Sequence, residues 1–222
     1  MHNWPGMAAG QFAIKSGPCF ASSNEFKITI RGKGSHGAMP HLGRDPIAIG
    51  GGVLAELQRI VSRNVDPGHA AVVSVTEFHA GSAYNVIPSQ AVLRGTFRYF
   101  DESDRDLIEA RIRQICAGLA LANEVAISVD IRHVFDILIN DPERAGDAVR
   151  AARDIVGDRA AADAEPTMGS EDMADLLRVV PGAFFNLGHD GGVPLHNPGF
   201  IFDDSILPVG ASILARLIET RG

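Results

Sequence analysis

Several polar residues in this sequence are of types, and in sequence surroundings, that suit metal binding or contact with a substrate. His2 stands in "HNWPG" and His196 in "HNPGF", near-copies at opposite ends of the chain. Imidazole is the commonest side-chain ligand of transition metals, so two such loops could meet on one ion. The same residues are also typical of an ordinary turn, since Asn and Pro favour turns. On spacing alone, we favour the turn.

Two further sets of residues could contact a substrate. His36 shares the glycine-rich loop "GKGSHGAMPHLG" with His41, where an accessible imidazole can donate a hydrogen bond to a developing oxyanion. Asn85 precedes a predicted strand, and Arg98 lies on the polar face of that strand, where a guanidinium can bind a carboxylate bidentately. A surface histidine and a solvated sheet face, shared with Arg94, are the simpler interpretations of each pattern by itself.

A third set lies near position 170. Glu171 and Asp172 follow "TMGS" at a predicted helix start. Acidic residues in a first helical turn normally cap the helix or complement its dipole, and we assign both to that role. The segment "TMGSED" could also line a pocket.

The elements that must position these residues form one complete unit. Alternating apolar residues predict strands in "EFKITIRG", "AAVVSVTEFHAG", "AVLRGTFRYF" and "EVAISVDIRHVF". One predicted helix follows Asp45 as N-cap and Pro46, and a second is capped by Ser103. The order is β-α-β-β-α-β over about residues 24–134, a ferredoxin-like arrangement with two helices on one face of an antiparallel sheet.

The flanks do not complete a second domain. They predict one strand around Gln11 to Ile14, a strand in "GAFFNLG" that is apolar on both faces, and three helices. The helices begin at Asp141-Pro142, in "SEDMADLLRVV" and in "DDSILPVGASILARLIET". We therefore expect an incomplete α/β domain, residues 1–22 and 135–222, into which an α+β domain of residues 23–134 is inserted.

Composition excludes several classes of protein. The net charge of −7 and the scattered basic residues give no field for nucleic acid or an anionic membrane. No apolar run approaches the ~20 residues of a membrane helix. Cys19 and Cys116 are in no metal or redox spacing, and we expect reduced structural thiols in a cytoplasmic protein.

The motifs taken together are more specific than any one of them. "HNWPG", "EFKITIRGKGSHGAMPHLGRDPI", "YNVIPSQAVLRGTFR", "EPTMGSEDMADLL" and "LHNPGFIFDD" occur in this order. In this combination the chain resembles the metal-dependent amidohydrolase family of aminoacylase, hippurate hydrolase and carboxypeptidase G. The resemblance covers the whole chain and implies a two-metal catalytic domain, with zinc or manganese, and an inserted ferredoxin-like lid that mediates homodimerisation.

The resemblance also implies a role for each candidate residue. His2 and His196 match metal ligands, and His36 matches the lid histidine that stabilises the tetrahedral intermediate, often in the partner's site. Asn85 and Arg98 match residues that hold an N-acyl amino acid, with Arg98 on its free carboxylate, and Gly169 falls in a loop over the substrate.

The family's other ligands and its general base lie in Cys-Asp-Gly-His and Glu-Glu segments that precede the histidine matching His2. We therefore expect a truncated amidohydrolase that is inactive alone. Two alternatives stay open: a non-catalytic dimeric module that binds an amino acid or a partner, and a decayed product whose flanks do not fold.

Overall fold

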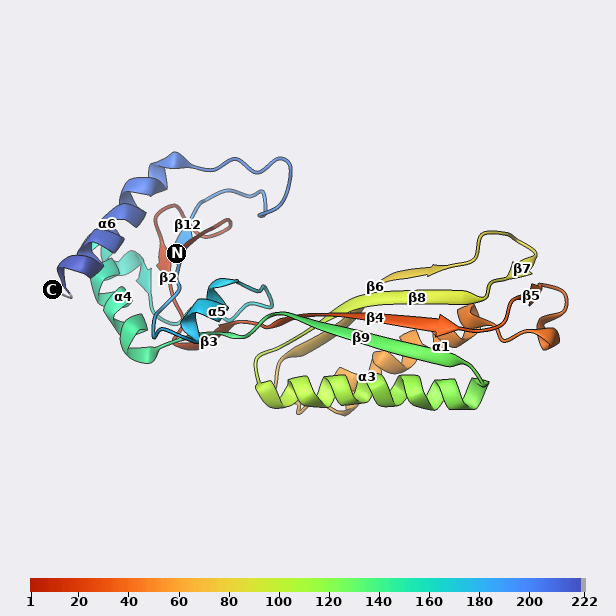
Figure 1. Cartoon of the computed structure of the whole chain (residues 1–222). Coiled ribbons are helices and arrows are strands. Elements are labelled where there is room, and N and C mark those ends of the chain that lie inside the picture. The colour runs from red at the N-terminus through yellow and green to blue at the C-terminus, as the bar shows by residue number, and fades with distance from the viewer. Residues whose placement is uncertain (221–222) are drawn as a thin grey trace. The chain divides into compact units, whose positions relative to one another are not determined.

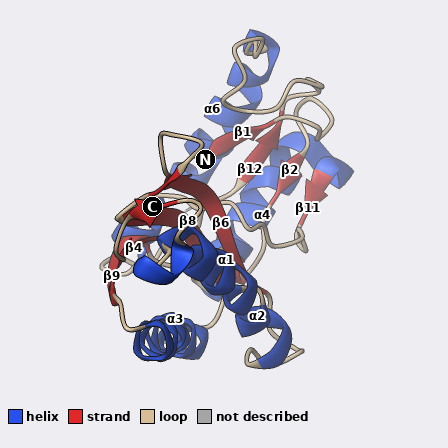
Figure 2. Cartoon of the chain, turned by 90° about the vertical axis from the view of Figure 1, so that its right-hand side faces the viewer, coloured by secondary structure: helices blue, strands red, loops and turns tan. Residues whose placement is uncertain are grey.

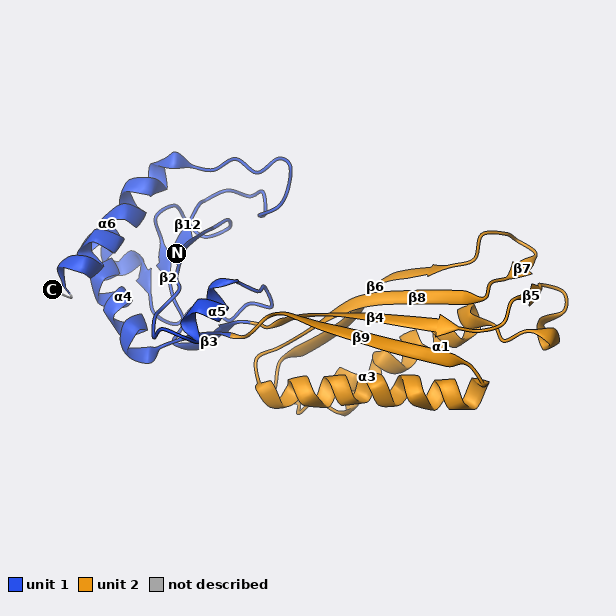
Figure 3. Cartoon of the chain, viewed as in Figure 1, with its two compact units in different colours: residues 1–20, 138–222 blue, residues 21–137 orange. Residues whose placement is uncertain are grey.

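The structure is a computed structural model that describes residues 1–220. The chain divides into two compact units, residues 1–20 with 138–222 and residues 21–137 (Figure 3). Each unit has a hydrophobic core of its own. Among the described residues, no helix has the length and apolar character needed to cross a membrane.

Residues 21–137 are built on a four-stranded antiparallel sheet in the order β6-β8-β4-β9 (Figure 1). Its strands are β4 (Ser23–Arg31), β6 (Ala71–Ala80), β8 (Gln90–Tyr99) and β9 (Ala126–Phe135). The alternation predicted from the sequence is observed in β8. Leu93 and Phe97 are fully buried, whereas Arg94 and Arg98 lie on the opposite face.

Three helices cover the buried face of this sheet: α1 (Pro46–Leu57), α2 (Arg59–Arg63) and α3 (Glu102–Asn123). The Asp45 carboxylate caps α1 by accepting from Ile47 N at 2.8 Å, as predicted. The predicted cap at Ser103 is wrong. Asp101 caps α3 instead, because its carboxylate accepts the backbone N–H of Ser103 at 2.9 Å.

The glycine-rich loop is held by hydrogen bonds to a segment that the sequence predicted to be a plain connector. β5 (Ser35–His36) pairs antiparallel with β7 (Val86–Ile87), followed in the loop by a short 3-10 helix, η1 (Pro40–Leu42). This pairing leaves no room for a side chain at Gly34, since a Cβ there would lie 2.9 Å from the Ile87 oxygen, and a Cβ at Gly37 would be a tight 3.3 Å from the Asn85 backbone.

The other unit, residues 1–20 and 138–220 of the described chain, has a mixed four-stranded sheet in the order β1-β12-β2-β11 (Figure 2). The strands are β1 (His2–Trp4), β2 (Phe12–Ala13), β11 (Ala160–Ala161) and β12 (Asn186–Gly188). A second pair joins β3 (Gly17–Phe20) to β10 (Leu138–Asn140). The sequence missed most of these strands because two or three residues are too few to show alternation.

Helices α4 (Pro142–Val156) and α6 (Leu207–Glu219) pack on this sheet through the core around Phe12, Leu187 and Ile213. Shorter helical segments complete the unit: η2 (Gly157–Arg159), α5 (Met173–Leu177) and η3 (Asp204–Ile206). The architecture is therefore mixed α/β with several sheets, which confirms the predicted class at that level.

Candidate functional site

His2 lies on β1, and one of its ring nitrogens makes a hydrogen bond to the backbone. Its Nδ1 is 2.6 Å from the backbone oxygen of Asn3. A carbonyl can only accept, so Nδ1 donates and the neutral ring keeps its lone pair on Nε2. Metal-ligating histidines commonly donate their other ring N–H to a backbone carbonyl in this way. The chemistry of His2 therefore suits a metal ligand.

His196 lies in a turn of the long loop between β12 and η3. It is exposed and has a φ of +64°, a conformation that few residues other than glycine adopt. The turn is closed by the Asn197 amide, which donates to the Pro194 oxygen at 3.4 Å. Such backbone strain is often found at functional positions.

Two imidazoles do not make a complete metal site, because a catalytic zinc ion normally takes three protein ligands and water. Among residues 1–220, the structure gathers no group of three or more His, Cys, Asp or Glu side chains that could hold a metal ion. The donor set described here therefore does not fit a whole metal centre.

A residue that the sequence analysis did not select ties the two histidine-bearing segments together. His189 is 4% exposed, and its Nε2 accepts the backbone N–H of Asp203 at 2.7 Å. Its own amide donates to the Trp4 oxygen at 3.2 Å, and its ring stacks on Phe200 with 5.0 Å between centroids. His189 thus closes the loop that carries His196 and joins it to the segment after His2. The sequence signal that could have identified His189 is its place in "NLGHDGG", beside glycines and after a buried strand.

His36 and Asn85 are brought together by the β5–β7 pairing. His36 pairs with Val86, and the Gly37 amide donates to the Asn85 oxygen at 2.7 Å. The exposed His36 ring accepts the Ala38 N–H at Nδ1, at 3.1 Å. The neutral ring therefore carries its proton on Nε2, where it can be donated to a ligand.

Arg98 lies on the separate four-stranded sheet, near the end of β8 that is far from β7. It is on β8, eight residues beyond the Gln90 end that adjoins β7 (Figure 1). At roughly 3.3 Å per residue this separates Arg98 from the β7 end by about 26 Å. Arg98 lines a depression of about 530 Å³ on the open sheet face with Thr96 and Glu25. Unit 21–137 thus holds the candidate substrate-binding residues in two separate places.

The segment around Gly169 is part of the other unit. The Gly169 amide donates to Thr167 Oγ1 at 3.2 Å, and a Cβ at Gly169 would meet only ordinary contacts. Asp172 is the N-cap residue of α5 but its side chain makes no capping hydrogen bond, so of the predicted role, cap or dipole complement, the cap is wrong. Burial raises the pKa of the neighbouring Glu171 carboxyl, and a hydrogen bond with Asp172 raises it further.

Both cysteines are buried and unpaired, as expected. Burial raises the pKa of the Cys19 thiol to about 12 and that of Cys116 to about 11. Both remain protonated near neutral pH, which excludes a thiolate nucleophile.

Residues 22–124 match the family described as the peptidase dimerisation domain. The chain is 35% identical over 217 residues to a Campylobacter jejuni hippurate hydrolase, covering 97% of this chain and 57% of that protein. It is 34% identical over 217 residues to an N-acetylcysteine deacetylase of Bacillus subtilis, with coverages of 98% and 57%.

Among solved structures, it is similar to the Bacillus subtilis YXEP protein, described as a dinuclear metal binding peptidase from the M20 family. The TM-score is 0.76 and the identity 31%, over 98% of this chain and 55% of that one. The chain spans little more than half the length of these relatives. Residues 22–124 thus match the peptidase dimerisation domain family, and the chain as a whole is similar to a hippurate hydrolase, an N-acetylcysteine deacetylase and an M20-family peptidase.

Proposed function

We propose that this chain carries part of the machinery of a metal-dependent amidohydrolase that cleaves the amide bond of N-acyl amino acids. The observation that carries the proposal is the pair of opposite hydrogen-bonding roles at His2 and His36. His2 donates from Nδ1 and keeps a lone pair for a metal, whereas His36 accepts at Nδ1 and keeps a proton for a substrate oxygen. The named activities of the relatives, on hippurate and N-acetylcysteine, support the substrate class.

In this proposal each residue has one task. His2 and His196 each supply one ligand to a zinc or manganese centre of two ions, and the remaining ligands come from outside residues 1–220. His36 donates from Nε2 to the oxyanion that develops on the acyl carbonyl, an interaction worth about 10²–10³ in kcat at comparable sites. Asn85 helps to hold the acyl end of the substrate. Gly169 lies in a loop over the substrate. Arg98 binds the free carboxylate.

The distance between His36 and Arg98 supports a site shared by two copies of the chain. Gln90, the β8 residue nearest β7, and Arg98 are about 26 Å apart along the strand, which is too far for one N-acyl amino acid to span. We therefore propose a homodimer, formed by a ferredoxin-like lid of residues 23–134, in which His36 and Asn85 of one copy serve the substrate held by Arg98 of the other. The strand order β6-β8-β4-β9 supports the lid assignment, and the dimerisation-domain match supports the assembly.

The experiment is a fusion of this chain to the part of the Campylobacter jejuni hippurate hydrolase that it does not match. We expect the fusion to release glycine from hippurate or cysteine from N-acetylcysteine. A chelator should abolish the release, and zinc or manganese should restore it. A folded, metal-loaded fusion that hydrolyses neither compound would reject the proposal.

The second candidate is a non-catalytic module that binds an amino acid derivative. It is favoured by one observation, the lack of any three-ligand metal group among residues 1–220. Calorimetry of the 222-residue chain with hippurate in the presence of a chelator separates the two. Tight metal-free binding, together with an inactive fusion, would favour the module.

A further inference from the structure

Two segments form a tip around His36 at one end of the unit of residues 21–137. The tip comprises residues 34–43, which contain β5 and η1, and residues 80–88, which contain β7 (Figure 1). The β5–β7 pair joins the two segments, and the Met39 amide donates to the His36 oxygen at 2.8 Å. Hydrogen bonds of its own backbone therefore hold the tip in shape.

The outside of the tip is neutral and largely apolar. Neither of its segments contains Asp, Glu, Lys or Arg, whereas charged residues line the depression on the open face of the four-stranded sheet. Several large apolar side chains of the tip are exposed: Tyr84 fully, and Met39, Leu42 and Val86 by 49%, 53% and 52%. Apolar residues that are exposed singly need no explanation, but a group of them in one place marks a binding surface.

An N-acyl group has the chemistry that this surface can recognise. It consists of a carbonyl oxygen, which accepts hydrogen bonds, and a hydrocarbon group on the same carbon. His36 offers a proton at Nε2, and the uncovered Tyr84 ring lies two residues from Val86, the strand partner of His36. The hydrocarbon group must lie close to whichever residue donates to the carbonyl oxygen. The carboxylate of the amino acid needs a cation, and the two segments contain no Lys or Arg.

We propose that the tip recognises the acyl group of the substrate and that Tyr84 selects for aromatic acyl groups. This inference rests on the proposed function, in which His36 donates to the acyl carbonyl. A benzoyl ring can pack on the Tyr84 ring, and aromatic pairs are more favourable than their buried area alone predicts. An acetyl group places only a methyl group there, so it gains much less from the same contact.

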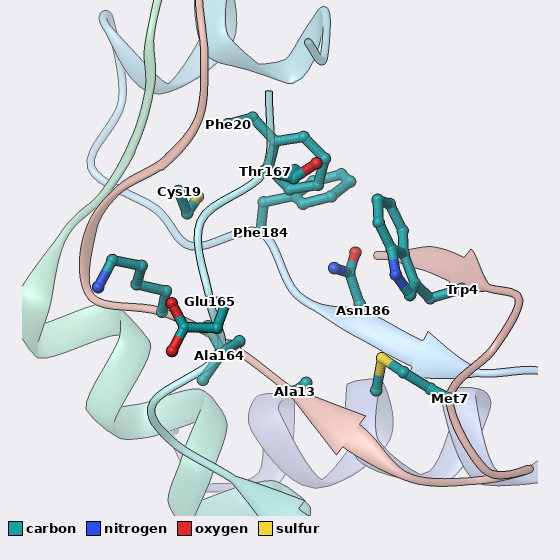
Figure 4. Close-up of a pocket in the computed structure, with 12 residues that line it drawn as sticks. Trp4, Met7, Ala13, Cys19, Phe20, Ala164, Glu165, Thr167, Phe184 and Asn186 are labelled. Carbon is teal, nitrogen blue, oxygen red and sulfur yellow. The ribbon is translucent and has the colours of Figure 1, made fainter. Parts of the chain in front are cut away.

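A second aromatic surface, in the unit of residues 1–20 and 138–220, suits this role less well. Its rings line a cavity of about 200 Å³ (Figure 4). They already pack on one another, since Trp4 lies edge-on to Phe20 with 5.8 Å between centroids and Phe20 lies edge-on to Phe184 at 5.5 Å. The fully exposed tyrosine of the tip, in contrast, has a ring that no other side chain of residues 1–220 covers.

The test compares hippurate with N-acetylglycine, two substrates that share glycine and differ only in the acyl group. Each is given to the fusion of this chain with the unmatched part of the Campylobacter jejuni hippurate hydrolase, and kcat/KM is measured. We expect the fusion to prefer hippurate and Tyr84→Ala to lower that preference about tenfold, as for other apolar substrate contacts. Tyr84→Phe keeps the ring, so its preference should stay within about twofold of the wild-type value.

Ile218→Ala is the matched control, because Ile218 is 75% exposed and lies in α6, in the other unit. Its preference should equal that of the wild-type fusion. An unchanged preference in Tyr84→Ala, an equal fall in Ile218→Ala, or a wild-type fusion that prefers N-acetylglycine would overturn the inference while the proposed function stands. So would a shift of Tyr84→Ala from dimer to monomer in size-exclusion chromatography, because the tip would then be a contact between copies. A fusion that hydrolyses neither compound would reject the proposed function and this inference with it.

Discussion

At the scale of single residues, backbone partners decide what each histidine can do. His2 donates to a carbonyl and His36 accepts from an amide, so the neutral rings present a lone pair in one case and a proton in the other. The sequence identified both residues from their motifs. It could not predict the tautomers, because these depend on where the Asn3 carbonyl and the Ala38 amide point. His189 was missed because its role depends on a contact with Asp203, fourteen residues away.

His69 makes the first prediction, on pH. Its Nδ1 is 3.0 Å from the carboxylate of the buried Asp104, and this hydrogen bond raises the pKa of His69 above the ordinary 6.5. A raised folded pKa means that the folded chain holds the proton more tightly than the unfolded chain. The stabilisation is therefore complete below pH 6.5 and is lost as pH rises through the folded pKa of His69.

Urea denaturation of wild type and His69→Gln at a series of pH values measures this effect. The midpoint of the wild-type chain should fall relative to that of the variant as pH rises from 6 to 9, a range of about three units chosen to span the raised pKa. Parallel pH profiles for the two chains would contradict the assignment.

At the scale of elements, the loop that carries His196 depends on His189. Replacing His189 by Phe keeps a ring on Phe200 but leaves the Asp203 N–H without its acceptor. We expect a loss of about 1–2 kcal/mol in unfolding free energy and faster hydrogen exchange at Asp203. His189→Gln is the control, since its carbonyl oxygen can accept in place of Nε2. Unchanged hydrogen exchange at Asp203 in His189→Phe would show that the hydrogen bond between His189 and Asp203 does not stabilise the loop.

Two glycines in residues 21–137 should respond to alanine in opposite directions. A Cβ on Gly95 of β8 would lie 2.1 Å from the Ser74 oxygen and 2.3 Å from the Phe26 ring, so Gly95→Ala should destabilise by about 3 kcal/mol or more. A Cβ on Gly51 of α1 would meet nothing within 4 Å, so Gly51→Ala should stabilise by about 0.5–1 kcal/mol. Thermal denaturation of both variants checks the pair, and equal effects would contradict it.

The elements of residues 21–137 could be predicted because their strands are nine or ten residues long and alternate clearly. The sequence signals are weaker elsewhere, because β1, β2, β11 and β12 have only two or three residues and their pairing is set by the tertiary fold. The glycines of α1 show the same limit. The sequence does not distinguish Gly50, Gly51 and Gly52, yet of these three only Gly50 has a neighbour so close that an added Cβ would clash, at 2.5 Å from Phe78.

At the scale of the whole molecule, the proposal requires two copies of the chain. His36 and Asn85 lie at the β5–β7 pair, whereas Arg98 lies near the far end of β8 in the four-stranded sheet. In this proposal a second copy brings both places to one ligand. In a symmetric dimer with two composite sites, a defect in His36 and a defect in Arg98 fall in the same site when they come from different copies. A heterodimer of the two variants then has one intact site and one doubly defective site.

That property gives the most direct test of the central claim. His36→Ala and Arg98→Ala versions of the fusion enzyme, with different affinity tags, are co-expressed and the heterodimer is purified. Hippurate hydrolysis is then compared with each homodimeric variant. We predict that both homodimers are reduced at least about a hundredfold in kcat/KM and that the heterodimer recovers roughly half of the wild-type activity. A heterodimer as inactive as its parents would contradict a site shared between copies.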